Sequence, residues 1–239
     1  MEMKDKLLYE GKAKQVFTVE GNPELLILSY KNDATAFNGE KKAKFQGKGR
    51  YNNLISAKVF DYLHQHGVKS HFKEALNETE QLVEKTTIIP LEVVVRNVAA
   101  GSIVRRTGIK EKTIFNPPLV EFFYKKDELG DPLINDEHAL LLTDATESDL
   151  QQLKEMARQV NEYLQAFFKE INLQLVDFKL EFGRNAHGDI ILSDEVSPDT
   201  CRLWDIATGE KMDKDVFRED LGDLVTVYDH ILTRLEAKQ

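Results

Sequence analysis

The stretch Leu175–Gly183 constrains the fold of this chain more than any other, because polar and apolar residues alternate along it. Side chains of a β-strand point alternately to its two faces, so this alternation predicts a strand. One face would carry the charged residues Asp177, Lys179 and Glu181. The other face would carry the apolar residues Val176, Phe178, Leu180 and Phe182. The sequence therefore predicts a strand with core on one side and a row of charges on the other.

A second short strand follows and predicts a hairpin. Residues Asp189–Ser193 are largely apolar, and Asn185 and Gly188 supply turn residues between the two strands. The hairpin would bring Asp194, at its exit, close to Glu181. Two converging carboxylates suit Mg²⁺, which is usually held by one or two carboxylates while nucleotide phosphates and water complete its shell. An ordinary half-exposed strand with alternating ion pairs would show the same pattern, so both interpretations stay open here.

Composition narrows the class of protein. The chain has 239 residues, 41% of them hydrophobic, and can bury a full core in one large or two modest domains. Its formal net charge of -9 argues against a broad nucleic-acid surface, so local basic clusters must meet any anionic substrate. A single cysteine, Cys201, excludes an internal disulfide framework. With no signal-like segment after Met1 and no apolar run of membrane-spanning length, we expect a cytoplasmic protein without membrane contact.

The N-terminal part predicts a hairpin preceded by a glycine-containing loop. Strands are expected at Lys14–Val19 and Leu25–Tyr30, with a turn at residues 21–23. Gly11 permits close backbone approach, and Lys12 and Lys14, two residues apart, can point the same way. Such a loop can cover phosphates, but lysines beside a glycine are often only solvated. The loop alone does not decide between these two interpretations.

A long polar segment and a helix come next. Residues Lys31–Arg50 are polar and contain glycines, and we expect a loop whose length has a functional reason. From Tyr51, apolar residues recur at helical spacing until Gly67, which can end the helix. We interpret this helix as scaffold for the core.

The following segments predict a mainly antiparallel sheet. Residues Gln81–Ile89 and Leu91–Val98 are rich in β-branched residues and are separated by Pro90. Arg96 lies near the end of the second segment and must find a partner, because burial of an unpaired guanidinium is costly. That partner is either a core carboxylate or an oxyanion, which the Ser102 hydroxyl and nearby backbone amides would also bind.

Two amphipathic helices complete the predicted scaffold. One follows a cap formed by Thr146 and Asp149, and the other follows a cap at Asp213 and continues as one helix towards the end of the chain. Arg218, in the first turn of the second helix, is a candidate to reach a functional site. The histidines lack the spacing typical of a zinc site, and no nucleophile motif is present. We therefore expect neither zinc chemistry nor a nucleophilic triad.

Four motifs, in order along the chain, resemble those of one enzyme family. They are Gly11-Lys12-Ala13-Lys14, Val95-Arg96-Asn97 with Gly101-Ser102, the strand Val176–Gly183, and Ser197-Pro198-Asp199 with Arg202-Leu203-Trp204-Asp205. On these residues the chain resembles phosphoribosylaminoimidazole-succinocarboxamide synthase (SAICAR synthetase) over essentially its whole length. The last two motifs are very specific, and the first is supportive only.

The resemblance implies an ATP-dependent carbon–nitrogen ligase of purine (IMP) biosynthesis. Such an enzyme joins 5-aminoimidazole-4-carboxylate ribonucleotide (CAIR) to L-aspartate and releases ADP and phosphate. Activation is needed because a carboxylate has no good leaving group until the γ-phosphoryl of ATP converts it to an acyl phosphate, which the amine then attacks. Phosphoryl transfer depends mainly on positioning and on cancelling charge.

The resemblance also implies nucleotide and metal contacts. Glu181 and Asp194 would be the Mg²⁺ carboxylates. The segment that joins the lobes would hold adenine partly through its backbone, and the expected ATP contacts are Gly11, Lys12, Ala13, Lys14, Val83 and Ile88.

Arginines suit the ribonucleotide phosphate, because a guanidinium can bind an oxyanion through two parallel hydrogen bonds. The expected phosphate contacts are Arg96, Ser102 and Arg202. Lys179 would meet the carboxylate being activated, and Asp177 and Asp199 would hold ribose or imidazole groups, so Lys179 and Asp177 are the expected catalytic residues. The candidates for L-aspartate, with Arg218 as a further substrate contact, are Thr35, Asn38 and Lys125.

The implied fold is a two-lobed α+β architecture with ATP between the lobes. The N-terminal lobe would be an antiparallel sheet of the kinase or ATP-grasp kind at residues 1–85, and a larger α/β lobe would span residues 86–239. A homo-oligomer of two subunits is expected. Two alternatives remain: a carboxylate–amine ligase for another substrate pair, and a regulatory protein that binds Mg·ATP without turnover.

Overall fold

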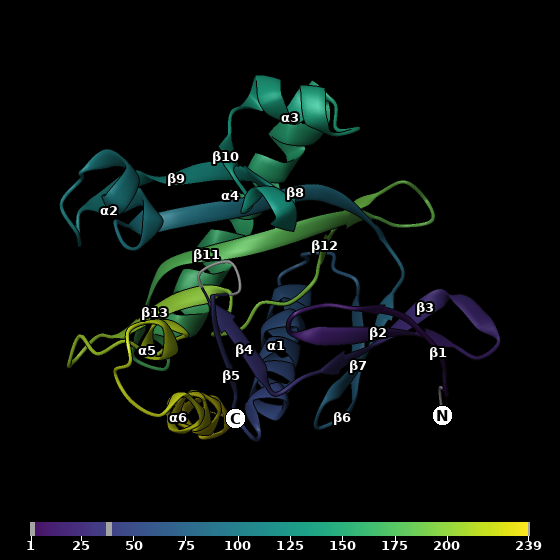
Figure 1. Ribbon diagram of the computed structural model, residues 1–239, viewed down its shortest axis with the longest axis horizontal. Coiled ribbons are helices and arrows are strands. Elements are labelled where there is room, and N and C mark those ends of the chain that lie inside the picture. The colour runs from purple at the N-terminus through teal and green to yellow at the C-terminus, as the bar shows by residue number, and fades with distance from the viewer. Residues whose placement is uncertain (1–2, 37–39, 239) are drawn as a thin grey trace.

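The structure, a computed structural model, describes residues 3–36 and 40–238. Two antiparallel sheets dominate it, and the longest helices pack against them (Figure 1). One sheet is built from the first part of the chain and the other from the later part. The architecture is the mixed α and β fold with antiparallel sheets that the resemblance implies.

The first sheet contains the predicted N-terminal hairpin. Its strands pair antiparallel in the order β1-β2-β3-β7-β6. Their bounds are β1 (Lys4–Glu10), β2 (Lys14–Val19), β3 (Asn22–Tyr30), β7 (Glu80–Glu84) and β6 (Phe72–Asn77). The two strands predicted over residues 14–19 and 25–30 are confirmed.

The second sheet contains the charged strand. Its order is β10-β9-β8-β11-β12, and β13 also pairs with β11, at the opposite end from β12. The bounds are β8 (Thr87–Val98), β9 (Ile114–Tyr124), β10 (Leu133–Ile134), β11 (Leu173–Arg184), β12 (Ile190–Ser193) and β13 (Cys201–Asp205). Because β11 is paired along both edges, the predicted strand over residues 175–183 is an interior strand.

Pro90 does not separate two strands, contrary to the prediction. β8 runs through it, and Pro90 lies where the pairing with β11 shifts register, between Glu92 opposite Glu181 and Ile88 opposite Gly183. Proline lacks a backbone N–H and is tolerated in a sheet at such an irregularity. The Pro90 carbonyl still accepts a hydrogen bond from the backbone of Lys125.

Val176 of the charged strand does not lie on the face that the sequence predicted for it. Phe178, Leu180 and Phe182 join the main core, but Val176 packs in a separate cluster with Trp204. The pairing of β11 with β13 shifts register just there, between Leu175 and Asp177. An irregularity of this kind reverses the parity of side chains along a strand.

The sequence suggested one continuous loop after β3, but this polar segment contains regular structure. It contains a small hairpin of β4 (Asp33–Ala36) and β5 (Lys41–Lys44), and helix α1 (Lys48–Gln65) begins before Tyr51. Ala34 packs in a cluster with Phe217 and Tyr228 from the end of the chain. Among the described side chains of the hairpin, Ala34 and the partly buried Ala43 contact that cluster, and two alanines do not make a recognisable strand pattern in the sequence.

The remaining helices carry the scaffold faces. Their bounds are α2 (Ser102–Thr107), α3 (Asp136–Leu142), α4 (Glu147–Lys169), α5 (Asp215–Arg218) and α6 (Leu224–Glu236), with a short 3-10 helix, η2 (Asp127–Leu129). The capping box of Thr146 and Asp149 at the start of α4 is confirmed. The prediction of a single final helix after Asp213 is wrong. The helical segment is interrupted between α5 and α6, and Asp223 caps α6. The Asp213 carboxylate instead accepts backbone hydrogen bonds from Leu203 and Asp215.

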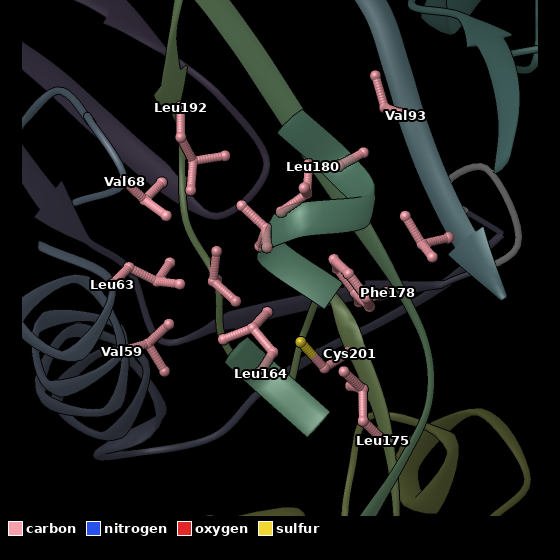
Figure 2. Packing of buried hydrophobic residues seen from close by; sticks show 14 of the residues in the cluster. Val59, Leu63, Val68, Val93, Leu164, Leu175, Phe178, Leu180, Leu192 and Cys201 are labelled. Atoms are coloured by element: carbon pink, nitrogen blue, oxygen red, sulfur yellow. The ribbon is translucent and has the colours of Figure 1, made fainter. Parts of the chain in front are cut away.

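The main core lies between α1, α4 and the second sheet. Figure 2 shows Val59 and Leu63 of α1 and Leu164 of α4 facing the apolar side of β11. Helix α1 precedes Glu84, where the first sheet ends, yet it packs in this core with the second sheet. Both parts of the chain therefore share one apolar core. The first sheet ends at Glu84 and β8 begins at Thr87, while the division into lobes at residues 85 and 86 stays a prediction.

Candidate active site

A cavity of about 660 Å³ opens onto strands from both sheets. Every site residue predicted from the sequence lines it except Asn38, which lies outside the described residues. The predicted residues that line it are Gly11, Lys12, Ala13, Lys14, Thr35, Val83, Ile88, Arg96, Ser102, Lys125, Asp177, Lys179, Glu181, Asp194, Asp199, Arg202 and Arg218. Residues as far apart in the sequence as Gly11 and Arg218 are thus brought to one place, although their individual roles remain predictions.

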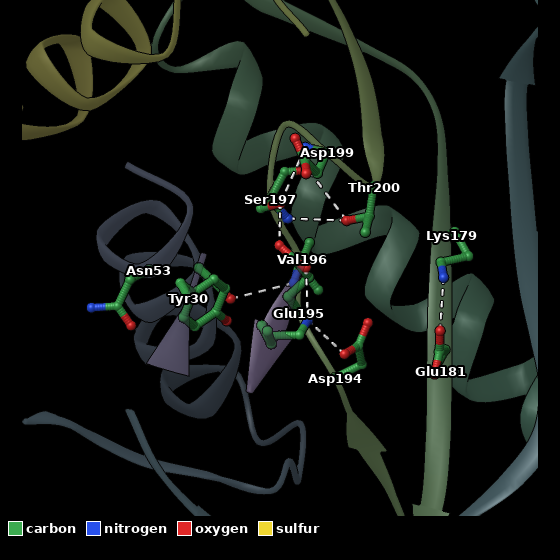
Figure 3. A network of polar contacts seen from close by, with 12 residues as sticks. Tyr30, Asn53, Lys179, Glu181, Asp194, Glu195, Val196, Ser197, Asp199 and Thr200 are labelled. Carbon is green, nitrogen blue, oxygen red and sulfur yellow. Dashed lines mark hydrogen bonds and ion pairs between the residues drawn. The ribbon is translucent and has the colours of Figure 1, made fainter. Parts of the chain in front are cut away.

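Lys179 lies at the centre of the charged strand. Its ammonium is 2.7 Å from the Glu181 carboxylate and 2.9 Å from the carboxylate of Glu92 on β8 (Figure 3 shows the first contact). Burial alone would lower the pKa of Lys179, but Glu181, Glu92 and Asp194 raise it well above its ordinary value. Lys179 therefore stays a cation at neutral pH. Lys125 makes a further 2.8 Å ion pair with Glu181.

Asp194 lies at the exit of β12, where the hairpin was predicted to place it. Ser193 pairs with Glu181 across the hairpin, so Asp194 follows the residue opposite Glu181. Lys14 forms 2.7 Å ion pairs with both Asp194 and Glu195. Burial would raise the pKa of Asp194, but Lys14, Lys179 and Lys125 hold it well below its usual range. Both predicted metal carboxylates therefore belong to one network of alternating charges.

The donor set fits magnesium bound together with a nucleotide. Within residues 3–36 and 40–238, no group of three or more His, Cys, Asp or Glu side chains is arranged to hold a metal ion. Mg²⁺ does not require such a group, because one or two carboxylates, phosphate oxygens and water commonly complete its shell. The carboxylates of Glu181 and Asp194 are therefore suitable donors for a metal that arrives with ATP.

The arginine cluster shows the carboxylate pairing that the sequence left open. Arg96 donates hydrogen bonds to Glu121 at 2.6 Å, Asp177 at 2.7 Å and the Ser102 hydroxyl at 3.0 Å. Asp177 also accepts from Arg202 at 3.0 Å, so it joins the two guanidinium groups. Both arginines still line the cavity, where their remaining N–H groups can meet an anion.

Gly101 allows the close approach of Arg202. The backbone there has a φ of +62°, in the left-handed region, and a Cβ added to Gly101 would lie 2.5 Å from the guanidinium of Arg202. Any larger residue would displace that guanidinium. A second arginine, Arg218, shares Asp215 with Arg202, with contacts of 2.6 and 2.8 Å.

The glycine–lysine loop forms the turn between β1 and β2. The Gly11 backbone N–H donates to the Lys14 carbonyl at 2.8 Å, which closes the turn. The side chains of the two lysines have different partners, since Lys12 is half exposed and pairs with Asp127 at 2.7 Å while Lys14 is largely buried. Both line the cavity, together with the apolar side chains of Val83 on β7 and Ile88 on β8.

Asp199 has a structural partner that the sequence did not indicate. The ammonium of Lys48, which is completely buried, lies 2.5 Å from the Asp199 carboxylate, and the Tyr228 hydroxyl donates to it at 2.6 Å. Burial would raise the pKa of Asp199, but Lys214 and Lys48 hold it well below its usual range. The Gly47-Lys48-Gly49 sequence had been assigned only to a polar loop. A lysine between two glycines carries no local sign of burial.

Other residues at the site were also missed. Glu92, Glu195, His71 and Lys214 line the cavity, and none lies in a pattern that separates it from an ordinary strand or loop residue. His71 is buried, and its ring nitrogen Nε2 lies 2.8 Å from the Asp194 carbonyl.

None of the helices in the described ranges is long and apolar enough to cross a membrane.

Comparisons of the sequence with known proteins agree with this picture. The SAICAR synthetase family matches residues 7–235. A relative from Oceanobacillus iheyensis, a phosphoribosylaminoimidazole-succinocarboxamide synthase, is 65% identical over 235 residues, which cover 98% of this chain and 99% of the relative.

Solved structures give the same result. A SAICAR synthetase (Type-2) in complex with ADP is 47% identical, with a TM-score of 0.91 over 95% of this chain and 96% of that chain. The phosphoribosylaminoimidazole-succinocarboxamide synthase from Ehrlichia chaffeensis is 43% identical, with a TM-score of 0.93 over 97% of this chain and 99% of that chain. Sequence, fold and cavity together show that the chain belongs to the SAICAR synthetase family.

Proposed function

We propose that this chain joins CAIR to L-aspartate with ATP, giving SAICAR, ADP and phosphate in purine (IMP) biosynthesis. The observation that carries the proposal is that one cavity holds the half-buried lysine of the charged strand, Lys179, and the arginines Arg96 and Arg202, which share Asp177. CAIR has a carboxylate to be activated and a phosphate to be held. The cavity offers a cation for the first group and guanidinium groups for the second.

ATP would bind between the lobes formed by residues 1–85 and 86–239. The turn from Gly11 to Lys14 would contact the phosphates, and the segment from Val83 to Ile88 would hold adenine. Magnesium, held by Glu181 and Asp194, would neutralise charge on the phosphates of ATP. A relative of the same fold has been solved with ADP, which supports a nucleotide site.

CAIR would bind beside the nucleotide. Arg96, Arg202 and Ser102 would hold its phosphate, and Asp177, already hydrogen-bonded to both guanidinium groups, would fix their positions and meet a ribose or imidazole group. Asp199 is a further candidate for such a group. Thr35, Lys125 and Arg218 line the same cavity and remain candidates for L-aspartate, as does Asn38 by its position in the sequence.

The reaction then needs two substitutions. A carboxylate oxygen of CAIR attacks the γ-phosphorus of ATP, the bond to the β-phosphate oxygen breaks, and ADP leaves. The amine of L-aspartate attacks the acyl carbon of the resulting acyl phosphate, loses a proton, and phosphate leaves. The role of Lys179 would be electrostatic. Its raised pKa keeps it protonated, so its positive charge can stabilise the negative charge on the reacting carboxylate and phosphoryl groups.

Phosphate release tests this proposal. The protein is mixed with Mg·ATP, CAIR and L-aspartate, and each component is omitted in turn. We expect phosphate only when all are present and a large loss of rate in Lys179→Met. Failure of the complete mixture to release phosphate would contradict the proposal.

The same assay separates the two alternatives. A ligase for another substrate pair would release phosphate with a different acid, and Arg96 and Arg202 would have no task if that acid lacked a phosphate group. A regulatory protein would bind ADP in calorimetry without phosphate release in any mixture.

The proposed substrates suggest a cytoplasmic enzyme. Family resemblance alone suggests a homo-oligomer of two subunits, and sedimentation would test this number.

A further inference from the structure

His71 occupies a junction between the two sheets. Its backbone N–H donates to the Leu192 carbonyl of β12 at 2.8 Å, and its own carbonyl accepts from the backbone of Glu84 at 2.6 Å. Glu84 ends β7 and is the second residue of the segment from Val83 to Ile88 that is proposed to hold adenine. The neighbouring Lys69 carbonyl accepts from Leu192 at 3.1 Å, so this segment is hydrogen-bonded along β12. The backbone of His71 therefore joins the nucleotide segment to the hairpin that carries Asp194.

The His71 side chain reaches the same hairpin. Nε2 lies 2.8 Å from the Asp194 carbonyl oxygen, and because a carbonyl cannot donate, Nε2 must carry the proton and donate it. His71 is 4% exposed, and its ring packs edge-on against Phe60 at a centroid distance of 5.7 Å. Its orientation is thus fixed from two sides.

Asp194 needs such support. Its φ is +61°, in the left-handed region that residues with a Cβ adopt at a cost. This conformation places its carboxylate in the cavity, where it pairs with Lys14. Without a hydrogen bond to its carbonyl, the chain after Ser193 would relax towards an extended conformation and change the direction of the carboxylate.

We propose that His71 is a positioning residue, which holds the backbone of Asp194 so that its carboxylate faces the metal of Mg·ATP, and which links that carboxylate to the adenine segment. The inference rests on the proposed nucleotide and metal roles. Groups that orient metal ligands typically affect metal affinity or activity by about 10- to 100-fold. A histidine that merely fills the core would affect stability but not the preference for nucleotide with metal.

The test measures ADP binding by calorimetry, with and without Mg²⁺, so it does not depend on turnover. His71→Phe keeps an aromatic ring against Phe60 but removes the donor, and His71→Gln retains an N–H donor near the Nε2 position. We expect Mg·ADP to bind about 10-fold or more weakly to His71→Phe, with less than about threefold change for ADP alone. His71→Gln should remain within about threefold of the original protein for both.

The contrary results are distinct. Unchanged Mg·ADP binding in His71→Phe, or equal weakening with and without Mg²⁺, would overturn the positioning role. Equal loss in the glutamine variant would show that the donor is not what matters and would overturn it as well. If His71→Phe does not fold, His71→Met replaces it in the same comparison. Failure of the unsubstituted protein to bind ADP would instead contradict the proposed function.

Discussion

The Lys179 ammonium and the Glu181 carboxylate, two residues apart on β11, lie 2.7 Å from each other inside the cavity. The Glu181 carboxylate also forms an ion pair with Lys125, so it neutralises two cations. Magnesium bound to Glu181 would compete for this carboxylate, and Glu92 would keep Lys179 in place. In the proposed site, metal binding and the position of Lys179 would therefore be linked through one side chain.

Glu181→Gln should lower turnover by about 100-fold, because it removes a metal carboxylate and leaves Lys179 with one fewer partner. Phosphate release measured across a range of Mg²⁺ concentrations checks this. Glu111→Gln, an exposed residue on the loop before β9, serves as the control and should behave like the original protein. A Glu181→Gln rate equal to that of the control at every concentration would rule out the metal role.

Gly101→Ala should raise the KM for CAIR by about 10-fold, because the new methyl group would displace the Arg202 guanidinium. Gly108→Ala is the control, since Gly108 also has a positive φ, +73°, but no neighbouring atom within 4 Å of an added Cβ. Gly108→Ala should lose about 1 kcal/mol of stability from αL strain, and Gly101→Ala should lose about 1–3 kcal/mol because its ψ of -125° lies outside the αL region. Equal KM values for the two variants would show that Arg202 does not bind the ribonucleotide.

Lys48→Met should destabilise the fold by about 3–5 kcal/mol, because it removes a buried ion-pair partner of Asp199. Urea unfolding gives the change in unfolding free energy. Lys58→Met, on the same helix and without an ion pair in the described part of the chain, should change it by much less. Adding Asp199→Asn to Lys48→Met should recover part of the loss, and simple additivity of the two substitutions would argue against a coupled pair.

Stability should fall in mild acid because of His71. Burial lowers the pKa of His71 from 6.5 to about 4, so the unfolded chain binds more protons between these values and stability rises with pH. The full contribution is present above about pH 6.5, and about 2 kcal/mol of it is lost by about pH 5. Urea unfolding at both pH values, without metal or nucleotide, should show a smaller loss in His71→Gln. An identical pH dependence would mean that another group controls acid stability.

Local patterns predicted the centre of the site. Alternation along β11 places Lys179 and Glu181 on one face, and the length of the β11–β12 turn fixes the register that brings Asp194 beside them. Both depend on residues within one hairpin, where side-chain parity and turn chemistry act over short distances. The same reasoning failed for Val176, because the register shift that turns it away is set by β13, a separate strand.

Contacts between distant segments were beyond local patterns. Lys48 meets Asp199 across 151 positions, and Arg96 meets Asp177 across 81, so neither partner could be chosen from its neighbours in the sequence. The break between α5 and α6 has a related cause. Asp213 resembled a helix cap because aspartate suits that position, but its carboxylate is used by the backbone of β13, which approaches only in the folded chain.

Isotope transfer tests the central claim, activation of the CAIR carboxylate by phosphorylation, most directly. CAIR labelled with ¹⁸O in its carboxylate is converted with unlabelled Mg·ATP and L-aspartate, and the released phosphate is analysed by mass spectrometry. An acyl phosphate requires one carboxylate oxygen to leave with the phosphoryl group, so the account predicts one ¹⁸O atom in each phosphate formed. Phosphate released without label, while SAICAR accumulates, would contradict it.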